Sequence, residues 1–356
     1  MNKIQNNFSI EEKKEIIKKT WLLKPTKEIP FIIDIEPRHT ATKKYFQSDK
    51  AELDWNLNYH NEQRKGINDY SIPNIKLNKG IGLIASAFGC NYHVNEKADP
   101  WIKPIIFEKN VNDVYDLAIP DVKKNNIFKE VYNRIEFFQL NSDLPIRLAK
   151  IPSPLVTASL IWDYTSFVTA MILYPKEVHS LLEKITIVTI DFINEQLSRI
   201  KNLFAMSHEM LYIPKNFGIR ISDDVAALLS PTLYKEFGVK YNTIISKAFR
   251  GIIVHSCGDM QNVVETMMEI EGLRGLDFTL PNNSNWEIIK KTVVGKVALN
   301  LRYWHADLNV GSEVDFLVYT NKIVEFFGQK GIFLQTSALN SEQARNYADN
   351  FHKILT

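Results

Sequence analysis

Eight short apolar runs, most of them followed by a segment with helical periodicity, constrain the fold of this chain more than any other feature. Apolar runs of roughly 4–8 residues bounded by turn residues are typical of strands buried on both faces, as in a parallel sheet. Strand–helix alternation repeated in this way predicts an α/β protein, a (β/α)8 TIM barrel. The predicted strands are residues 30–36, 82–87, 145–149, 218–221, 251–257, 273–277, 297–301 and 331–334.

The segments between these runs carry helix signals. Ser9 and Glu12 have the spacing of a capping box, and an amphipathic helix is expected from there to about Leu23. This helix is expected to cover one end of the core, so residues 1–28 are interpreted as an N-terminal helical cap on a single barrel domain spanning 1–356. A small hairpin is expected within 91–104, and further helices are expected over 111–141, 153–200 with a break near Pro175, 231–248 and 341–355.

Composition and charge argue against several classes of protein. The 356 residues are 45% hydrophobic and 24% charged, which is a globular composition. A net charge of +2 and the lack of a recognition motif argue against nucleic acid as a partner. No apolar run approaches the roughly 18 residues needed to span a bilayer, and the N-terminus lacks an apolar signal segment. Two cysteines cannot form a disulfide scaffold, so a cytoplasmic protein is expected. A small molecule is the expected substrate.

Polar side chains collect at the carboxyl ends of the predicted strands, where the active site of such a barrel lies. Acidic residues at loop starts are also common helix caps, so Asp223, Asp224 and Asp277 are equally consistent with capping. The candidate substrate-binding residues are Asp34, Arg38, Asp223, Tyr303 and Gln335, and the candidate catalytic residues are Glu36, Asp224 and Asp277.

His255 and Cys257 stand at the end of the fifth predicted strand, followed by Gly258. Side chains at positions i and i+2 of a strand lie on the same face, so the imidazole and the thiol point the same way. Both are zinc ligands, and the glycine permits a sharp turn directly after them. A buried His and Cys that only pack in the core are the alternative. The pair supplies two ligands, whereas a catalytic zinc has three from the protein.

Four motifs occur in order along the chain. They are Ser153-Pro154-Leu155-Val156-Thr157-Ala158-Ser159, Leu229-Ser230-Pro231-x-x-Tyr234-x-x-Phe237, His255-Ser256-Cys257-Gly258-Asp259 and Gly275-Leu276-Asp277-Phe278-Thr279. Together they resemble the motifs of the uroporphyrinogen decarboxylase superfamily, over about residues 80–355. That superfamily includes the decarboxylases themselves and the methylcobamide:coenzyme M methyltransferases, and the resemblance implies a barrel fold.

The decarboxylase branch differs from this chain in four places. Its Arg-rich first strand and loop correspond to residues 34–38, where Asp34 and Glu36 would repel a polyanionic porphyrinogen. Its Asp after the second strand corresponds to residues 85–87, Ala-Ser-Ala. Its Tyr falls near Leu160, and its C-terminal His near Ser337 or Ala338. These departures argue against porphyrinogen decarboxylation.

The methyltransferase branch holds zinc with His-x-Cys on the fifth strand and a further Cys after the eighth. His255 and Cys257 match the first two ligands, and the stretch Phe88-Gly89-Cys90 also resembles that branch. Ser337 stands where the third ligand is expected. The alternatives for that ligand are His305, Asp277, Glu36 and Cys90, and they stay open at this point.

This resemblance implies methyl transfer between a methylated cobamide and a nucleophile, such as a thiol, that a zinc ion activates. The methylcobamide is expected on a small corrinoid protein, which would dock over the barrel mouth. His255 and Cys257 would hold the metal, while Asp277, Asp224 or Glu36 would orient His255 or accept the proton of the thiol.

Two other functions are consistent with the sequence. A decarboxylase for a different acid would need a cationic pocket, which Arg38, Arg147, Arg220 and Arg302 would form if they converge. A binding barrel without catalysis would explain the missing ligand and the missing tyrosine.

Overall fold

Six parallel strands form one curled sheet with the strand order β1-β8-β7-β6-β5-β4. The computed structural model describes residues 8–35, 48–93, 101–304 and 312–355. From β4 onward, each strand pairs with the next one along the chain, and β8 pairs with β1. The strands are β1 (Phe31–Ile35), β4 (Ile219–Ser222), β5 (Ile252–Ser256), β6 (Leu273–Thr279), β7 (Ala298–Arg302) and β8 (Ile332–Ala338).

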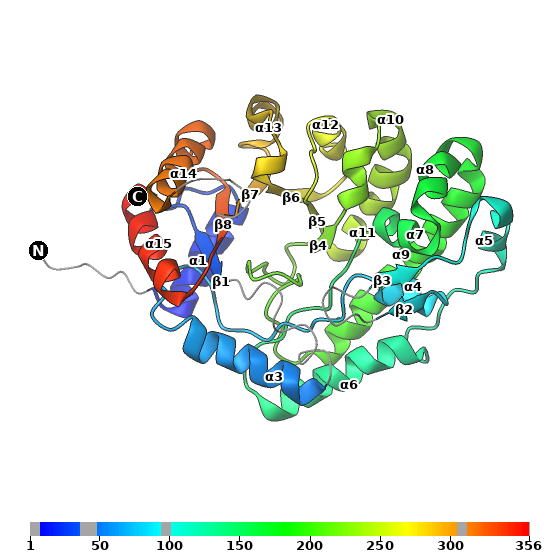
Figure 1. Cartoon of the computed structure of the whole chain (residues 1–356), viewed down its shortest axis with the longest axis horizontal. Helices are drawn as coiled ribbons and strands as arrows, with labels where there is room; N and C mark the ends of the chain where they lie inside the picture. Colours follow the sequence, from blue (N-terminus) through cyan, green and yellow to red (C-terminus); the bar gives the residue numbers. More distant parts are fainter. Residues whose placement is uncertain (1–7, 36–47, 94–100, 305–311, 356) are drawn as a thin grey trace, which may run out of the picture.

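Helices surround this curled sheet on the outside (Figure 1). The longest of them, α9, begins at Pro175, and the helix before it ends at Leu173, so the expected break near Pro175 is confirmed. The α-helices are α1 (Ile10–Trp21), α3 (Asp49–Asn58), α4 (Leu83–Ala87), α5 (Asp113–Asp116), α6 (Asn126–Asn141), α7 (Pro154–Ile161), α8 (Tyr164–Leu173), α9 (Pro175–Arg199), α10 (Pro231–Leu233), α11 (Lys240–Phe249), α12 (Val264–Met267), α13 (Trp286–Val293), α14 (Glu313–Phe327) and α15 (Ser341–Ile354).

Shorter turns complete the set. The π-helical turn η4 joins α10 to α11, so the helix predicted over 231–248 is present but distorted. Strands β2 and β3 form the expected antiparallel hairpin. The bounds are η1 (Tyr59–Gln63), η2 (Glu108–Asn110), η3 (Asp224–Leu228), η4 (Tyr234–Val239), η5 (Leu280–Asn282), β2 (Asn91–His93) and β3 (Trp101–Lys103).

Two of the eight predicted strands are wrong. Residues 83–87 form helix α4, and residues 145–149 contain only isolated parallel bridges, from Ile146 to Ile75 and to Leu203. A short apolar run fits a buried helix as well as a buried strand, and periodicity cannot separate the two. The helix predicted over 111–141 is also interrupted, because Pro120 lies between α5 and α6.

Irregular segments cross the gap between β1 and β4. Backbone hydrogen bonds connect them in sequence from one edge strand to the other, so the chain encircles a central space without eight regular strands. The sheet and these segments together are called the ring below. The backbone hydrogen bonds run from Tyr70 N to Phe31 O (2.9 Å), Ile75 N to Pro145 O (2.8 Å), Ile146 N to Asn202 O (2.9 Å) and Arg220 N to Met206 O (3.0 Å).

Helix α1 packs against the sheet through Trp21. Its N-terminus is the predicted capping box, in which the Ser9 hydroxyl accepts from Glu12 N and the Glu12 carboxylate accepts from Ser9 N. The Trp21 ring lies 4.5 Å from that of Phe333, and its Nε1 donates to the carbonyl oxygen of Tyr212 at 2.9 Å. Gly275 faces this ring, and a Cβ there would lie 2.7 Å from Trp21. The interpretation of 1–28 as a cap on a single domain stays a prediction.

The inside of the ring combines apolar packing with buried charge. Ile253 shares the inner face of the sheet with His255 and Asp277, whereas Leu276 and Leu301 are buried on the opposite face, where the helices pack. In the described ranges, no helix is both long enough and apolar enough to cross a membrane.

Candidate metal centre and interior cavity

The carboxyl end of β5 presents His255 and Cys257 side by side. The Nε2 atom of His255 lies 3.1 Å from the Sγ atom of Cys257. His255 is buried, whereas Cys257 is exposed. The two side chains therefore share one face, as their spacing predicts, and the thiol is the one that solvent can reach.

Asp224 completes a group of three potential metal ligands. It begins the turn η3 after β4, and its Oδ1 atom accepts a hydrogen bond from the backbone N of Cys257 at 2.7 Å. One nitrogen of His255, the sulfur of Cys257 and one carboxylate oxygen of Asp224 all lie within 4.8 Å of one another. This is the metal-ligand cluster found among the described residues, and it supplies nitrogen, sulfur and oxygen donors.

Asp277 on β6 holds the other side of the His255 ring. The Nδ1 atom of His255 lies 3.0 Å from the backbone oxygen of Asp277 and 3.3 Å from its carboxylate Oδ1. Because Nδ1 faces these acceptors, Nε2 is left to face Cys257. A carboxylate behind a histidine in this way fixes the tautomer and the ring orientation of a metal ligand.

Two arginines surround the Asp277 carboxylate. Arg220 contacts Oδ2 of Asp277 with Nη2 at 2.6 Å and Nε at 2.7 Å. The Nε atom of Arg302 lies 3.9 Å from Oδ1 of Asp277, and its Nη1 lies 3.4 Å from Nδ1 of His255. In the described structure, Oδ1 of Asp277 and Nε of Arg302 are buried without a hydrogen-bond partner. The centre thus retains polar atoms with spare bonding capacity.

The charges of this cluster shift the pKa of each group. Burial would raise the pKa of Asp277, but Arg220, His255 and Arg302 hold it well below its usual value. Burial lowers the pKa of His255, yet Asp277 raises it overall. Burial raises the pKa of the Cys257 thiol, but the hydrogen bond and the charge of His255 outweigh this and lower it. The arrangement therefore favours a thiolate beside an imidazolium when no metal is bound.

Asp34 and Gln335, both predicted to bind substrate, lie on neighbouring strands. Asp34 is at the end of β1, where its Oδ1 accepts a hydrogen bond from the Tyr59 hydroxyl. Gln335 on β8 is buried, and its Oε1 accepts from Nδ2 of Asn300 at 3.2 Å.

Asp223 and Tyr303 have their side-chain hydrogen bonds elsewhere. Asp223 is fully buried and accepts from Ser153 Oγ at 2.7 Å, Asn242 Nδ2 at 2.8 Å and the Tyr234 hydroxyl at 3.0 Å. Tyr303 is fully buried and pairs with Thr320 Oγ1 at 3.0 Å. Their bonds are those of residues that hold helices to the sheet.

The structure also places some of the residues that the sequence offered as a third metal ligand. Cys90 is buried with its sulfur 4.0 Å from the carbonyl oxygen of Leu160, and burial raises its pKa to about 12. It is therefore a core thiol, and the suggestion that its loop brings it to the metal is wrong. Ser337 is buried on β8. Glu36, Arg38 and His305 lie outside the described residues.

An interior cavity of about 50 Å³ lies next to this centre. Four charged side chains line it, together with an apolar wall formed by Trp55, Tyr59 and Met210. Arg220 connects the cavity to the centre, because its Nη1 lies 3.7 Å from Oε1 of Glu209 while its Nη2 contacts Asp277. The four charged residues are Asp34, Lys76, Arg147 and Glu209.

Sequence reasoning missed Lys76 and Glu209. Lys76 follows Ile75, whose bridge to Ile146 is isolated, and Glu209 lies in the irregular stretch between α9 and β4. That stretch runs through the inside of the ring (Figure 1), where the backbone oxygen of His208 accepts from Nη1 of Arg147 at 3.1 Å. Neither residue stands at the end of a recognisable strand, so the pattern of strand ends carried no signal for them.

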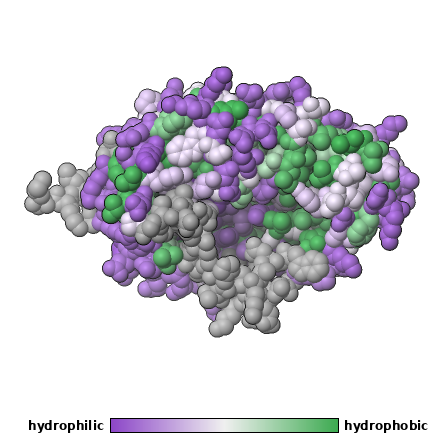
Figure 2. Space-filling model, turned by 45° about the horizontal axis from the view of Figure 1, so that its top comes forward, coloured by the Kyte–Doolittle hydropathy of each residue, from purple (hydrophilic) through white to green (hydrophobic). Residues whose placement is uncertain are grey.

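One face of the molecule is hollowed near its middle, and hydrophilic side chains line the visible part of the hollow (Figure 2). Hydrophobic residues gather to one side of it, on the right in that view. Among the exposed apolar side chains are Ile172 and Leu173 of α8, which are 69% and 59% exposed.

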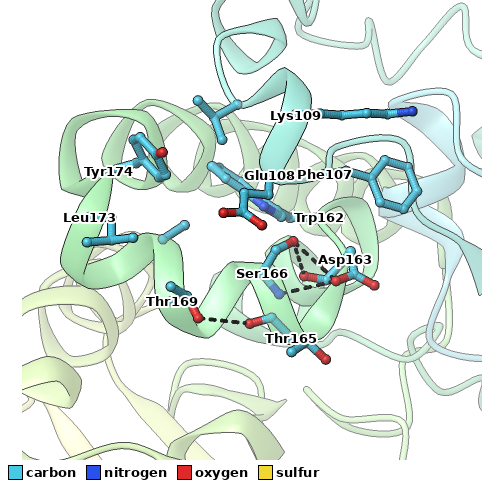
Figure 3. Close-up of a pocket in the computed structure, with 12 residues that line it drawn as sticks. Phe107, Glu108, Lys109, Trp162, Asp163, Thr165, Ser166, Thr169, Leu173 and Tyr174 are labelled. Carbon is cyan, nitrogen blue, oxygen red and sulfur yellow. Dashed lines mark hydrogen bonds between the residues drawn. The ribbon is translucent and has the colours of Figure 1, made fainter.

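A separate groove of about 590 Å³ lies outside the sheet, between η2, helix α8 and the residues Trp162 and Asp163 that join α7 to α8. Glu108 reaches into this groove near Trp162, while Ser166 is hydrogen-bonded to Asp163 (Figure 3). Asp163 is the N-cap of α8, so its hydrogen bonds explain its position. None of the residues that line this groove is a His or a Cys, and the ligand cluster does not belong to it.

Comparison with solved structures finds similar proteins. The structure is similar to that of a methyltransferase from Methanosarcina mazei, with 16% identity, a TM-score of 0.71, and coverage of 97% of this chain and 99% of that one. A protein described as a candidate vitamin-B12-independent methionine synthase from Listeria monocytogenes matches with 14% identity, a TM-score of 0.46, and coverage of 92% and 98%. No curated protein matches the chain in sequence.

Residues 62–207 match the family model described as uroporphyrinogen decarboxylase (URO-D). This match includes the Ser153-Pro154 motif, and the other three motifs follow it in the expected order. The resemblance inferred from the sequence is thereby confirmed over residues 62–207, the part of the chain that the family model covers.

Proposed function

We propose that this protein is a corrinoid-linked methyltransferase that moves a methyl group between a methylated cobamide and a metal-activated thiol. The observation that carries the proposal is the cluster of Asp224, His255 and Cys257 at the carboxyl end of β5. The fold likeness to a methyltransferase is consistent with this activity. The six strands and the irregular segments between β1 and β4 would together occupy the eight strand positions of a (β/α)8 barrel.

The residues present fit a zinc ion. Zinc takes imidazole nitrogen, thiolate and carboxylate oxygen at about 2.0–2.3 Å in a tetrahedral arrangement. Donors around such an ion lie roughly 3–4 Å from one another, and the 3.1 Å between His255 Nε2 and Cys257 Sγ agrees with that spacing. Asp224 would be the third ligand in place of the expected Cys. When bound, the metal supplies Lewis acidity that lowers the pKa of a coordinated thiol.

The side chains of this centre would have distinct roles in the reaction. Asp277 would hold His255 in the orientation that presents Nε2, and Arg220 and Arg302 would keep Asp277 ionised. Asp224 offers the oxygen that is not bonded to the Cys257 amide, either as a ligand or as acceptor of the thiol proton. The sulfur of the substrate thiolate would form a bond to the methyl carbon as the cobalt–carbon bond of the methylcobamide breaks. The electron pair of the broken bond would remain on cobalt.

The charge distribution favours this reaction over decarboxylation of a polycarboxylate. Arg220 and Arg302 converge, but on Asp277 rather than on open space, and Arg220 also contacts Glu209. Arg147 is buried and donates to Asn74 and to the carbonyl oxygen of His208. Among the described residues, Arg220 and Arg302 therefore face acids, and Arg147 is bound to neutral acceptors, so these three arginines do not converge on a common anion site.

Metal analysis and a cobamide assay test the proposal. The purified protein should contain close to one zinc per chain, and His255→Ala and Cys257→Ser should lose most of it. Free methylcobalamin can replace the corrinoid protein, which we propose as the physiological partner. With a small thiol, it should be demethylated to cob(I)alamin by the wild type, as seen in its absorption spectrum under anaerobic conditions.

Glu108→Gln is the matched control, because Glu108 lies in the outer groove away from the cluster. It should retain both zinc and demethylation. A wild-type protein that binds no metal after zinc loading, or that carries zinc and leaves methylcobalamin intact with every thiol offered, would contradict the proposal.

A further inference from the structure

The interior cavity beside the metal centre contains a charge arrangement that the metal does not explain. Its four charged residues are two acids, Asp34 and Glu209, and two bases, Lys76 and Arg147. Their formal charges cancel, yet the groups are not all paired with one another. The contacts of each group decide which of them remain available to a ligand.

Arg147 and Asp34 have partners within the protein. Arg147 is buried, with Nε bonded to Asn74 and Nη1 bonded to the His208 carbonyl oxygen. Asp34 lines the cavity and accepts from the Tyr59 hydroxyl through Oδ1, and no described residue donates a hydrogen bond to its second oxygen. Arg147 is thus part of the wall, while Asp34 has one oxygen to spare.

Lys76 and Glu209 are the groups left without close partners. Among the described residues, the Lys76 ammonium forms no hydrogen bond and no ion pair, although its side chain lines the cavity. Burial and the neighbouring Arg147 lower its pKa, and Glu209 is the largest influence in the opposite direction. Lys76 is half-buried, so its ammonium has lost part of its hydration without gaining a partner, and an anion from a ligand would stabilise it.

Glu209 has the complementary need. Its carboxylate accepts no hydrogen bond from the described residues, and its ion-pair contact is the 3.7 Å approach of Arg220. Burial raises its pKa, but Arg220, Arg302 and His208 together hold it well below its usual value, so it is ionised. An ammonium group from a ligand could approach it at a closer distance than Arg220 does.

We propose that this cavity binds the zwitterionic end of an amino-acid thiol, with its carboxylate at Lys76 and its ammonium between Glu209 and Asp34. This inference rests on the proposed function, since it takes the cavity as the far end of the acceptor site. Arg220 spans the two parts, because it touches Glu209 of the cavity on one side and Asp277, which lies behind His255, on the other. The methylene groups of the ligand would lie against Trp55, Tyr59 and Met210.

The size of the cavity agrees with a ligand of this class. At about 50 Å³ it accommodates a small polar group with its hydrogen-bond partners and excludes the body of a larger ligand. His60, also in the wall, has its pKa lowered to about 3 by burial, Arg147 and Arg64, so it is neutral and adds no charge. A purely anionic thiol would leave Glu209 unpaired, and a simple aminothiol would leave Lys76 unpaired.

Calorimetric binding of three matched thiols to the zinc-loaded protein tests the proposal. L-cysteine carries both charges, 3-mercaptopropionate lacks the ammonium, and cysteamine lacks the carboxylate. L-cysteine should bind at least about tenfold more tightly than either truncated thiol, because each omission leaves one charged group of the cavity without its partner. Equal affinity of 3-mercaptopropionate and L-cysteine would overturn the proposal, as would equal affinity of cysteamine and L-cysteine.

Two variants test which residue of the cavity binds each charged group of the ligand. Lys76→Met should weaken L-cysteine and 3-mercaptopropionate about tenfold or more and leave cysteamine within about twofold. Glu209→Gln should weaken L-cysteine and cysteamine by a similar factor and leave 3-mercaptopropionate nearly unchanged. Lys76→Arg and Glu209→Asp keep the charges and serve as second variants if the first do not fold. Glu108→Gln in the outer groove should bind all three thiols as the wild type does.

L-serine separates this inference from the proposed function, because it has both charges and no thiol. L-serine should compete with L-cysteine, and Lys76→Met and Glu209→Gln should each weaken it. Competition that depends on both charges would support the cavity assignment even in a protein that binds no metal. If zinc-dependent methyl transfer occurs and the affinities of the thiols do not depend on their ammonium or carboxylate groups, the cavity assignment is overturned and the proposed function stands.

Discussion

The Nε2 atom of His255 lies 3.1 Å from the sulfur of Cys257, while the opposite nitrogen of the ring lies 3.3 Å from the carboxylate of Asp277. The ring is therefore held from behind and presents one defined nitrogen to the sulfur. A thiol and an imidazole placed in this way can share a proton or a metal ion. The consequences of this relationship, and of the packing that maintains it, can be tested separately.

Asp277→Asn is expected to weaken zinc binding about 10–100-fold, in the range seen when the carboxylate behind a histidine ligand is removed. The amide keeps the shape of the side chain but loses the charge that Arg220 and Arg302 face. Competition with a chelator of known zinc affinity measures the change. Glu108→Gln should match the wild type, and an affinity for zinc unchanged by Asp277→Asn would argue against Asp277 as the residue that orients His255.

Cys257 should be the cysteine that iodoacetamide modifies. Its pKa is lowered by His255, so in the metal-free protein the thiolate persists to lower pH than in free cysteine, and alkylation at pH 7 should be faster. His255→Ala should move the pH dependence of the rate upward, and bound zinc should protect the sulfur. Cys90, buried and with its pKa raised to about 12, provides the internal control, and its modification before Cys257 would contradict this expectation.

Tyr234→Phe should lower the free energy of unfolding by about 1–3 kcal/mol, because it removes a buried hydroxyl that donates to the Asp223 carboxylate. Asp223 joins the N-terminus of α7, through Ser153, to the helical segment that carries Tyr234. Denaturant unfolding measures the change. Tyr115→Phe removes a hydroxyl with an exposed acceptor, Glu177, and should change stability by less than about 0.5 kcal/mol. Equal effects of the two substitutions would contradict the structural role of Asp223.

His352 should make stability decrease as the pH rises above about 6.5, the ordinary value for histidine. Its Nδ1 lies 3.0 Å from Glu28 and its Nε2 lies 2.8 Å from the Asn68 carbonyl oxygen, so both nitrogens can donate when the ring is charged. Burial lowers its pKa, but these two contacts raise it overall. The charged His352 ring is therefore favoured in the folded state. Its contribution to stability is complete when the pH is below the pKa of His352 in the unfolded chain. The contribution is lost as the pH rises through the higher pKa of His352 in the folded protein.

Comparison of the wild type with His352→Gln isolates this contribution from other titrating groups. The difference in unfolding free energy between the two proteins should shrink from pH 6 to pH 9. A difference that stays constant over this range would show that His352 does not titrate as the contacts imply.

Much of the fold could be predicted where the sequence pattern is local. The capping box at Ser9 and Glu12 forms as expected, and β5 to β8 occur where the apolar runs predicted them. The pattern failed at residues 82–87, because a run of small and apolar residues satisfies a buried helix as well as a strand. Residues 145–149 make only isolated bridges, since partners in the irregular part of the ring replace a regular ladder.

The motifs that resemble those of the superfamily serve two purposes in this structure. His255 and Cys257 form the chemical centre, whereas Ser153 and Tyr234 hold Asp223 in the core. A sequence motif does not distinguish these purposes, because a buried carboxylate at a strand end can face inward to a ligand or outward to a helix. The direction depends on the contacts of neighbouring elements.

The sequence by itself determined that His255 and Cys257 would share a face, because the alternation of side chains along a strand is a local property of the backbone. Only the tertiary structure decided that Asp224 would join them, that Asp277 would lie behind the ring, and that Lys76 and Glu209 would enter the same interior. These groups come from segments far apart in the chain, and their distances depend on how strands and irregular segments close around a common space. Local propensity carries no information about that closure, which arises from the packing of the whole chain.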